Sequence, residues 1–306
     1  MYSEENLKKA TNNFHHDRVT HRDFNYTLYK GIHQGRYISV KKFKPLLGLN
    51  CDSLGLITNE VAVASQMSKQ KNALKLLGCC IQTELPMLVY EFPANGNLSD
   101  HIEKNGWPLP WETKLKIASG IASAVAYLHH GLSKTIIHRD IVYGHVFLDH
   151  DNVAKLSEFQ TSVPIPAGET HVVAGVFGTH GFAAPDVEKY GWHTEKSDVY
   201  GFGILLCEIL TGKRYDALRW GSEFSDIYRR NSSNSVVESN DAWGRDLANV
   251  CAIHLKTKSN IWDEENRVQV MECAELVERC LQTNPNERPD MIQVAKALRF
   301  NKNIQH

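Results

Sequence analysis

The pattern of hydrophobic and polar positions changes near residue 91. Before that point, short runs rich in β-branched and aromatic residues are typical of strands: TLYKGI, RYISVKKF and PMLVYEF. A stretch from about Ser53 to Met67 has helical periodicity instead. The first part of the chain is therefore predicted to be a small lobe, built on a sheet with one main helix.

From residue 109 onward helical periodicity dominates. The stretch LPWETKLKIASGIASAVAYLHH (109–130) places one apolar face at Leu115, Ile117, Ile121, Val125 and Leu128. The run VYGFGILLCEIL (199–210) is too short to span a bilayer and contains Glu208, so it predicts a buried helix. This second part is predicted to be mainly helical. The segment EFPANGNL (91–98) connects the two parts, and the polar segment 229–240 is predicted to be a surface loop.

Composition narrows the class of protein. The chain has 34 Lys and Arg against 35 Asp and Glu, so nothing in its charge favours nucleic acid as a partner. Seven cysteines and the lack of an apolar N-terminal stretch predict a reducing cytosol without disulfides. We expect no integral membrane segment. The 15 histidines do not predict zinc, because no Cys and His pairs occur at ligand spacing.

Several motifs occur in the order and spacing of one family. They are VKKF with Lys41, NEVAVASQM with Glu60, HRD ending at Asp140, SEFQ with Glu158, GTHGFAAPD, SDVYGFG and NPNERP. The chain resembles the protein kinase family over almost its whole length, and ATNNF, LLGCC, LVYEF and LTGKR resemble its plant receptor-like branch. This resemblance implies an α+β, bilobal fold in one domain of residues 1–306. The implied N-lobe is 1–91 and the implied C-lobe is 92–306.

The loop that covers ATP phosphates in this family has lost its glycines. The family uses G-x-G-x-x-G so that backbone amides approach the phosphates. The matching positions here are His21, Asp23 and Tyr26. Either Asp23 faces the phosphates and repels them, or the loop swings outward and leaves the pocket open. Both alternatives disfavour tight ATP binding.

Lys41 and Glu60 match the pair that positions ATP in active kinases. With Tyr90 they are candidates for a weak ATP site, although Lys41 and Glu60 are equally well explained as a structural ion pair between sheet and helix. We expect Lys42 to be a solvated charge on the other face of the strand. No cofactor is expected to be required.

The resemblance also implies that Mg²⁺ should be held at the positions of Glu158 and His145. Mg²⁺ demands oxygen ligands in near-octahedral geometry, so an imidazole is a poor substitute and the longer Glu158 is misplaced. Asp140 keeps the position of the proton acceptor, but the neighbouring lysine position is Val142. Gln160 replaces the glycine that follows Phe159. We predict no metal site and no active catalytic residue.

The residues that support the fold in this family are retained: His138, Phe159, Asp186, Asp198 and Arg288. We expect Asp198 to anchor the HRD backbone and Asp186 to pair with Arg288. Because architecture survives where chemistry is lost, the sequence looks like a pseudokinase. A weak serine/threonine kinase remains an alternative. So does a nucleotide-binding switch without catalysis, in which the segment around Gly178 and Thr179 responds to ATP.

The chain is also similar to receptor-like cytoplasmic kinases of subfamily XII. HVFLD, KLSEFQTSVPIPAGET and ATNNF carry this likeness. It implies an adaptor in plant innate immunity, with a coiled-coil NLR receptor and an effector-modified receptor-like cytoplasmic kinase as partners. The implied location is the cytoplasm, at the plasma membrane through partners. We expect the activation segment (158–185) to be irregular and to bind the modified kinase, and Trp220, Trp243 and Trp262 to pack in the core rather than anchor an interface.

Overall fold

The structure is a computed structural model of the chain that describes residues 1–45, 52–103, 109–179, 181–215, 250–251, 253 and 264–300. Its residues divide into two compact units. The first comprises Met1–Leu98 and Gly144–Ser162, and the second comprises Ser99–Tyr143 and Val163–His306. Segment 229–240 and the three tryptophans Trp220, Trp243 and Trp262 lie outside the described residues.

The bounds of these units differ from the lobe ranges expected from the sequence, 1–91 and 92–306. Segment 144–162 belongs to the first unit because its backbone hydrogen-bonds there. Leu156 N donates to Asn72 O and Leu74 N donates to Leu156 O, each at 2.8 Å. The hairpin of this segment is formed by β7 (Val146–Leu148) and β8 (Ala154–Leu156).

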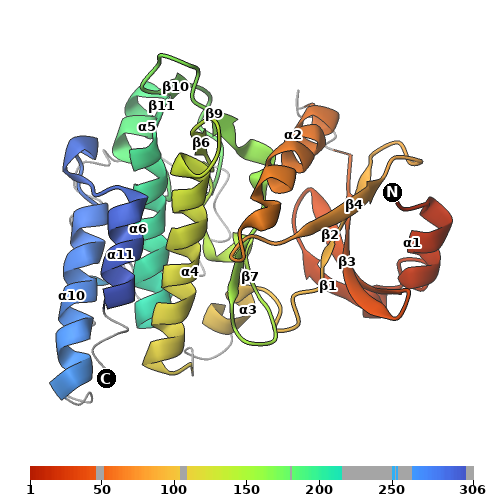
Figure 1. The fold of residues 1–306 in the computed structure, drawn as a ribbon, viewed down its shortest axis with the longest axis horizontal. Coiled ribbons are helices and arrows are strands. Elements are labelled where there is room, and N and C mark those ends of the chain that lie inside the picture. The colour runs from red at the N-terminus through yellow and green to blue at the C-terminus, as the bar shows by residue number, and fades with distance from the viewer. Residues whose placement is uncertain are drawn as a thin grey trace, which may run out of the picture. The chain divides into compact units, whose positions relative to one another are not determined.

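The first unit is built on a five-stranded antiparallel sheet with the strand order β1-β2-β3-β5-β4 (Figure 1). Its strands are β1 (Val19–Arg22), β2 (Tyr26–His33), β3 (Arg36–Phe43), β4 (Leu76–Cys80) and β5 (Met87–Glu91). The runs TLYKGI, RYISVKKF and PMLVYEF fall on β2, β3 and β5, so these strand predictions are confirmed.

Two helices accompany the sheet. In α1 (Glu4–Ala10), the Ser3 hydroxyl caps the first turn by accepting from Asn6 N. The helix buries Leu7 and Ala10 in a cluster with residues from β3, β4 and β5. The predicted helix near 53–67 is α2 (Ser53–Gln66), which begins where the Asp52 carboxylate accepts from Gly55 N at 2.9 Å.

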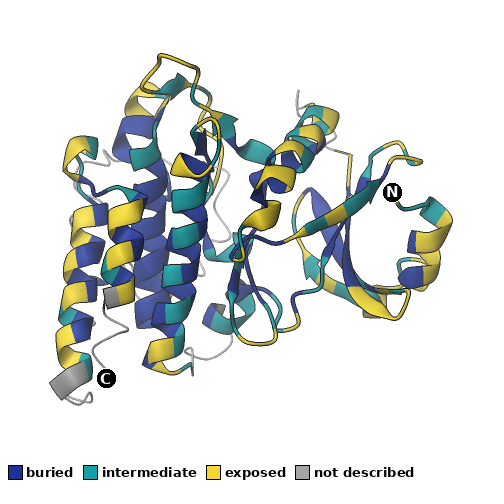
Figure 2. Ribbon diagram, viewed as in Figure 1, coloured by how far each residue is buried: buried dark blue, intermediate teal, exposed yellow. Residues whose placement is uncertain are grey.

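The second unit is a helical assembly with α6 at its core. The helices α4 (Trp111–His130) and α10 (Glu264–Cys280) pack against α6 (Glu195–Thr211), and α11 (Met291–Phe300) packs on α4. Nearly every residue of α6 is buried, as predicted for 199–210 (Figure 2). The five apolar positions predicted for α4 are all buried. Among the described residues, no helix is long and apolar enough to cross a membrane.

Short elements complete the unit. In the activation segment, the described residues 158–179 and 181–184 contain no α-helix, and its last residue, Pro185, begins α5. Two short strand pairs are present: β6 (Ile136–Ile137) with β9 (Val163–Pro164), and β10 (Val172–Val173) with β11 (Trp192–His193). Two short helices are α3 (Leu98–Glu103) and α5 (Pro185–Tyr190).

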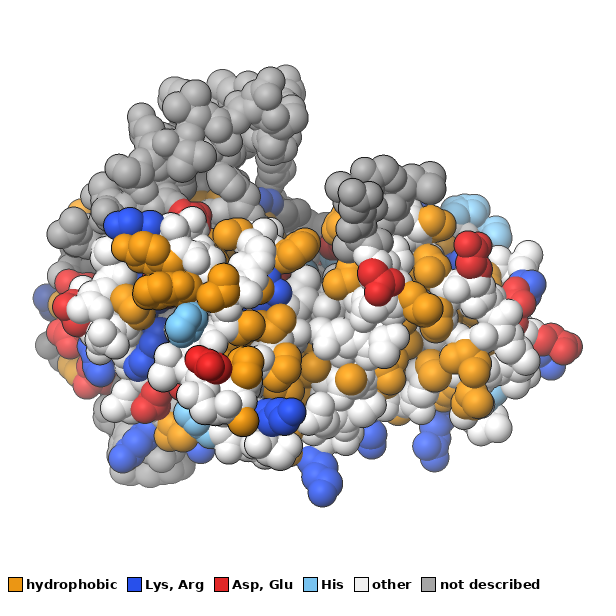
Figure 3. Space-filling model, turned by 90° about the horizontal axis from the view of Figure 1, so that it is seen from above, with side chains coloured by type: hydrophobic (Ala, Val, Ile, Leu, Met, Phe, Trp, Pro, Cys, Tyr) orange, Lys and Arg blue, Asp and Glu red, His pale blue; other side chains and the backbone are white. Residues whose placement is uncertain are grey.

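Large hydrophobic side chains are exposed around β10, β11 and α5. Figure 3 shows hydrophobic side chains gathered over this end of the second unit. The exposed residues are Val173, Val176, Phe177, Tyr190 and Trp192, each between 45% and 68% exposed. Exposed hydrophobic side chains that gather at one end of a unit are a feature of protein-binding sites.

Candidate functional site

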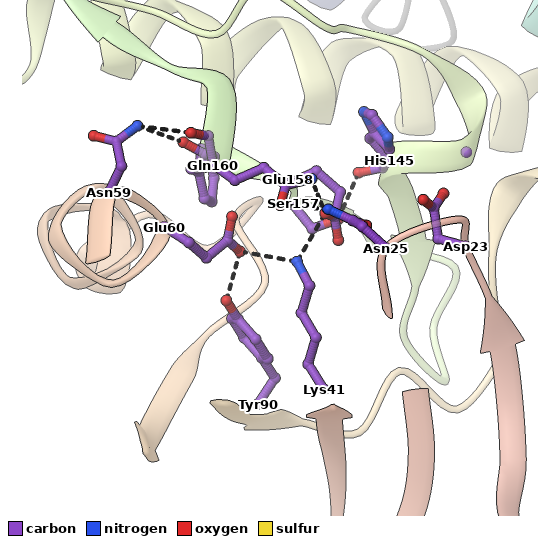
Figure 4. Close-up of polar contacts among 12 residues, drawn as sticks. Asp23, Asn25, Lys41, Asn59, Glu60, Tyr90, His145, Ser157, Glu158 and Gln160 are labelled. Atoms are coloured by element: carbon purple, nitrogen blue, oxygen red, sulfur yellow. Dashed lines mark hydrogen bonds and ion pairs between the residues drawn. The ribbon is translucent and has the colours of Figure 1, made fainter. Parts of the chain in front are cut away.

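Lys41 lies at the centre of a buried ionic cluster in the first unit (Figure 4). Its Nζ is 2.7 Å from Glu158 Oε2 and 3.6 Å from Glu60 Oε1. The three side chains are at most 3% exposed. Because successive side chains of a strand point to opposite faces, Lys41 is buried while Lys42 is exposed, with its Nζ 4.4 Å from the centre of the Phe14 ring. The Lys41 ammonium is thus paired with two carboxylates of its own chain.

Two buried tyrosines complete the cluster. The Tyr90 hydroxyl donates to Glu60 Oε1 at 2.6 Å, so this candidate ATP-site residue is bonded to the carboxylate of another. The ring of Tyr26, which is fully buried, lies 4.3 Å from Lys41 Nζ. This distance is within the range of a cation–π contact. The lysine is therefore surrounded by charged and aromatic groups of the first unit.

The pKa values in the cluster diverge. Burial lowers the pKa of Lys41, but Glu158 and Glu60 more than offset this and raise it overall. Burial raises the pKa of Glu158, yet Lys41 and then His145 bring it below its ordinary value. For Glu60, burial dominates, Lys41 offsets only part of it, and the net pKa is raised. Glu60 Oε2 is buried without a hydrogen-bond partner among the described residues. Lys41 and Glu158 are the principal ion pair, and Glu60 binds a proton more readily than an ordinary glutamate does.

The glycine-free loop is folded into the first unit. Its strands meet in register at Arg22 and Thr27, and only Asp23, Phe24 and Asn25 separate β1 from β2. The Asn25 side-chain amide, which is 4% exposed, donates to Gln160 Oε1 at 3.0 Å. Hydrogen bonding and burial at Asn25 thus hold this end of the loop against the first unit, which disfavours the alternative in which the loop swings outward.

Asp23 and His21 have local partners. The carboxylate of Asp23 accepts from Phe24 N at 2.6 Å, and the ring of His21 meets that of Phe147 edge-on, with 5.9 Å between centroids. The Asp23 charge also helps to raise the pKa of Tyr26, after the larger effects of burial and Glu158. The carboxylate expected to repel a phosphate thus contributes to the field at the buried cluster.

The segment that replaces the family's DFG sequence is fastened to α2. Asn59 donates from its side-chain amide to the backbone carbonyls of Phe159, Gln160 and Ser162, at 3.2, 3.0 and 2.8 Å. Glu158 itself adopts a left-handed conformation with φ 65°. Phe159 is fully buried. These bonds hold Glu158 where its carboxylate reaches Lys41. No pattern in the sequence marks Asn59, because its partners lie about a hundred residues away along the chain.

His145 and Glu158, the two positions implied for magnesium, have other roles here. The backbone carbonyl of His145 accepts from both the N–H and the hydroxyl of Ser157, each at 2.9 Å. The Glu158 carboxylate, besides its bond to Lys41, lies 3.4 Å from Gln160 Nε2. Its oxygens are thus directed at side chains of the first unit.

In the second unit, Asp140 is bonded to the activation segment. Its Oδ1 accepts from both the backbone N–H and the hydroxyl of Thr179, each at 2.9 Å. Val142, at the lysine position, is 4% exposed. Arg139 donates to the carbonyl of Gly175, and its guanidinium lies 5.4 Å from the centre of the Phe177 ring. Arg139 and Asp140 therefore both bind the activation segment.

The framework of the second unit depends on Asp198. Its carboxylate accepts from the backbone N–H groups of His138 at 2.8 Å and Arg139 at 2.9 Å, and lies 2.8 Å from His129 Nε2. Burial raises the pKa of Asp198, but these partners bring it below its ordinary value. Asp198 thus makes the backbone contacts expected from the sequence.

Arg288 and Asp186 also form the pair expected from the sequence. Arg288 Nη2 donates to Asp186 Oδ1 at 2.7 Å, so the shorter aspartate side chain still reaches. The guanidinium also donates to the carbonyls of Lys196, Gln282 and Thr283. Arg288 is 1% exposed, and all three nitrogens of its guanidinium donate hydrogen bonds to groups of the second unit.

Comparison with known proteins places this arrangement in a family. Residues 27–298 match the model of protein tyrosine and serine/threonine kinases, and the chain belongs to this family with its bilobal protein kinase fold. Wall-associated receptor kinase-like 4 of Arabidopsis thaliana is 36% identical to it, and the match covers 97% of this chain and 37% of the relative. For wall-associated receptor kinase-like 17 of the same plant the identity is 35%, with 96% and 36% covered.

A solved structure shares the fold at lower identity. It is the pseudokinase domain of BIR2, described as an immune regulator of the RLK/Pelle family. It aligns with a TM-score of 0.67 at 23% identity, over 97% of this chain and 85% of that chain. The chain thus spans nearly all of a single kinase-like domain but less than two fifths of the length of the two receptor kinases above.

Proposed function

We propose that this chain is a pseudokinase, a kinase domain that does not transfer phosphate. The observation that carries the proposal is the burial of Lys41 against Glu158 at 2.7 Å. In active kinases this lysine binds the α- and β-phosphates of ATP. Here the ammonium is 1% exposed and already paired, so a nucleotide has no free cation to bind at this position.

Magnesium and ATP do not fit the residues present. The family holds Mg²⁺ with the DFG aspartate and the catalytic-loop asparagine. Glu158, at the first position, is 3% exposed and bonded to Lys41, and His145, at the second, offers imidazole nitrogen in place of an amide oxygen. Val142 adds no positive charge for a transferring phosphoryl group.

The two alternative functions both require the cluster to open. A weak serine/threonine kinase and a nucleotide-binding switch each need Lys41 to leave Glu158 and turn to phosphate. Removing one partner from a buried ion pair costs about 3–5 kcal/mol, which nucleotide binding would have to offset. This cost favours the inactive protein over both alternatives.

For the working role, we propose an adaptor in plant innate immunity. The partners would be a coiled-coil NLR receptor and an effector-modified receptor-like cytoplasmic kinase, in the cytoplasm and at the plasma membrane through these partners. Three observations support this proposal: the sequence motifs shared with subfamily XII, the plant receptor kinases among the relatives, and the exposed hydrophobic side chains around β10, β11 and α5. Among these, Val173, Val176 and Phe177 lie in the activation segment (158–185), the region proposed to meet the modified kinase.

A phosphotransfer assay tests the first part of the proposal. The purified chain should incorporate no phosphate into itself or a generic substrate. The double variant His145→Asn with Glu158→Asp should stay inactive, because the loop at His21, Asp23 and Tyr26 is unchanged. Incorporation that Asp140→Asn abolishes would overturn the proposal.

A segment replacement tests the second part. A flexible linker in place of residues 163–176 should abolish binding of the modified kinase and leave receptor binding intact. The matched control is the same linker at the exposed β2–β3 turn around Gln34 and Gly35. Loss of the receptor with the modified kinase still bound would show that the two surfaces are assigned the wrong way round.

A further inference from the structure

We propose that His15, His16 and Asp17 form a binding site for one transition metal ion of the zinc, copper or nickel type. The site lies in the first unit, away from Lys41 in sequence, and goes beyond the proposed function. One ligand atom from each of the three residues lies within 4.8 Å of the others. Three consecutive residues do not follow the spacing of paired cysteines and histidines in zinc sites, so that spacing does not mark this cluster in the sequence.

The distances suit a bound ion. Asp17 Oδ2 is 3.3 Å from His15 Nδ1, and Asp17 Oδ1 is 3.0 Å from His16 Nε2. Around a tetrahedral zinc ion with bonds of about 2.0–2.1 Å, two donor atoms are separated by roughly 3.3 Å. The two distances run to different oxygens of Asp17, and His15 Nδ1 also accepts from Asp17 N. To share one ion, the three side chains must turn toward a common point and His15 must release this hydrogen bond; water would fill the remaining positions.

The local backbone brings these side chains together. Asn12, Asn13 and Phe14, directly before the cluster, have positive φ angles of 51°, 56° and 55°. Their left-handed turn leads into a single 3-10 turn, His16–Arg18, for which the His15 ring accepts from Asp17 N. The side chains of His15, His16 and Asp17 are 43%, 76% and 73% exposed, so an ion can reach them from solvent.

The donor set defines the class of ion. Two imidazoles with one carboxylate suit zinc, copper and nickel, whereas magnesium and calcium prefer oxygen donors alone. A bound ion would fasten the connection between α1 and β1. Since an ion that binds only the folded state stabilises it, the site also predicts a melting temperature that rises with zinc concentration.

Zinc titration of the full chain by calorimetry, without a chelating buffer, tests the site. We expect one site that the double variant His15→Ala with His16→Ala weakens at least about tenfold, since even partners of metal ligands are worth 10–100-fold in affinity. The matched control is His150→Ala. His150 is 77% exposed and lies 3.0 Å from Asp151, but this pair belongs to no three-ligand cluster of the described chain. This control should bind zinc as the unmodified chain does.

A second readout separates the site from general binding by the 15 histidines. Zinc should raise the melting temperature of the unmodified chain and of His150→Ala, but not that of the double variant. Failure to bind zinc below about 1 mM, which corresponds to only about 4 kcal/mol of binding free energy, would overturn the proposal. The same holds if the double variant gives the same titration as the unmodified chain.

Discussion

Each unit contains a buried cluster around ionised side chains: Asp198 and its partners in the second unit, and Lys41 with its two carboxylates in the first. The carboxylates of the two clusters bind different kinds of group. In the second unit Asp198 binds backbone N–H groups of His138 and Arg139, so its charge holds the chain itself in place. In the first unit Glu158 and Glu60 are directed at Lys41, a residue whose counterpart in active kinases binds a ligand. The charge of Asp198 is thus used to bind the backbone, whereas the charges of Glu158 and Glu60 are used to pair a side chain.

The two clusters also differ in the ratio of carboxylates to partners. Asp198 has three hydrogen-bonding partners for one carboxylate. The first unit has two carboxylates for one ammonium, and one oxygen of Glu60 has no hydrogen-bond partner in the described part of the chain. We therefore expect the loss of Asp198 to cost more stability than the loss of any member of the Lys41 cluster.

The largest effect is expected for Asp198→Ala. Two buried N–H groups and an imidazole would lose their acceptor, so the free energy of unfolding should fall by about 5 kcal/mol, the upper end for breaking a buried charged network. Urea denaturation measures this change. Glu275→Ala, an exposed carboxylate on α10, should change stability by less than about 0.5 kcal/mol. Equal losses in the two variants would remove the role assigned to Asp198.

The next effect is that of Lys41→Met. It leaves Glu158 and Glu60 buried without their cation, and we expect a loss of about 3 kcal/mol, less than for Asp198 because a carboxyl group can take up a proton. The matched control is Lys42→Met on the same strand. Lys42 is exposed, so its loss should cost less than about 1 kcal/mol. An unchanged unfolding midpoint in Lys41→Met would show that Lys41 is not held as described.

Asn59→Ala should have a smaller effect. Removing its amide takes a donor from the carbonyls of Phe159, Gln160 and Ser162, with an expected loss of about 1–2 kcal/mol. Hydrogen exchange should become faster in residues 157–162 while the second unit is unaffected. Thr58→Ala, the exposed neighbour on α2, is the control. Unaltered exchange in 157–162 would mean that other contacts hold this segment.

The smallest effect is that of Glu60→Gln, and it depends on pH. The raised pKa of Glu60, caused mainly by burial, means that the folded protein binds a proton there more readily than the unfolded chain. Ionised Glu60 thus costs stability at neutral pH, and this cost disappears as the pH falls through the folded pKa. Glu60→Gln should stabilise the protein at pH 7.5 and progressively less toward pH 4.5. Destabilisation that is constant with pH would contradict the pKa direction.

Asp198 provides the opposite sign within the same molecule. Its pKa is lowered, so it contributes stability above its unfolded pKa, and this contribution is lost as the pH falls through the folded value. Glu60 and Asp198 should thus respond to acid in opposite directions, whereas Glu158, whose pKa is also lowered, follows Asp198.

Local patterns predicted the elements of the fold, while contacts distant in sequence decided the site. Strands β2, β3 and β5 and the helices α2, α4 and α6 follow from local residue patterns within each segment. The boundary between the units did not, because residues 144–162 join the first unit by hydrogen bonds to residues such as Asn72 and Leu74. No local pattern carries information about such a pairing.

The same limit explains which site residues were found. Lys41, Glu60, Glu158 and Asp198 lie in motifs whose spacing was visible in the sequence. The bonds that close the cluster come from Asn25, Asn59 and Gln160, single polar residues without periodicity. Steric and charge arguments allowed the glycine-free loop to face either way, and the contact between Asn25 and Gln160 determines its direction.

Calorimetric titration of the chain with ATP and Mg²⁺ tests the central proposal, that Lys41 is paired within the first unit and is not available to a nucleotide. We expect no saturable heat and no change in melting temperature up to about 1 mM ATP, whereas a ligand at 100 times its Kd would stabilise the protein by about 2.7 kcal/mol. Saturable binding below about 0.1 mM, a binding free energy near 5.5 kcal/mol, would contradict the account if Lys41→Met abolished it.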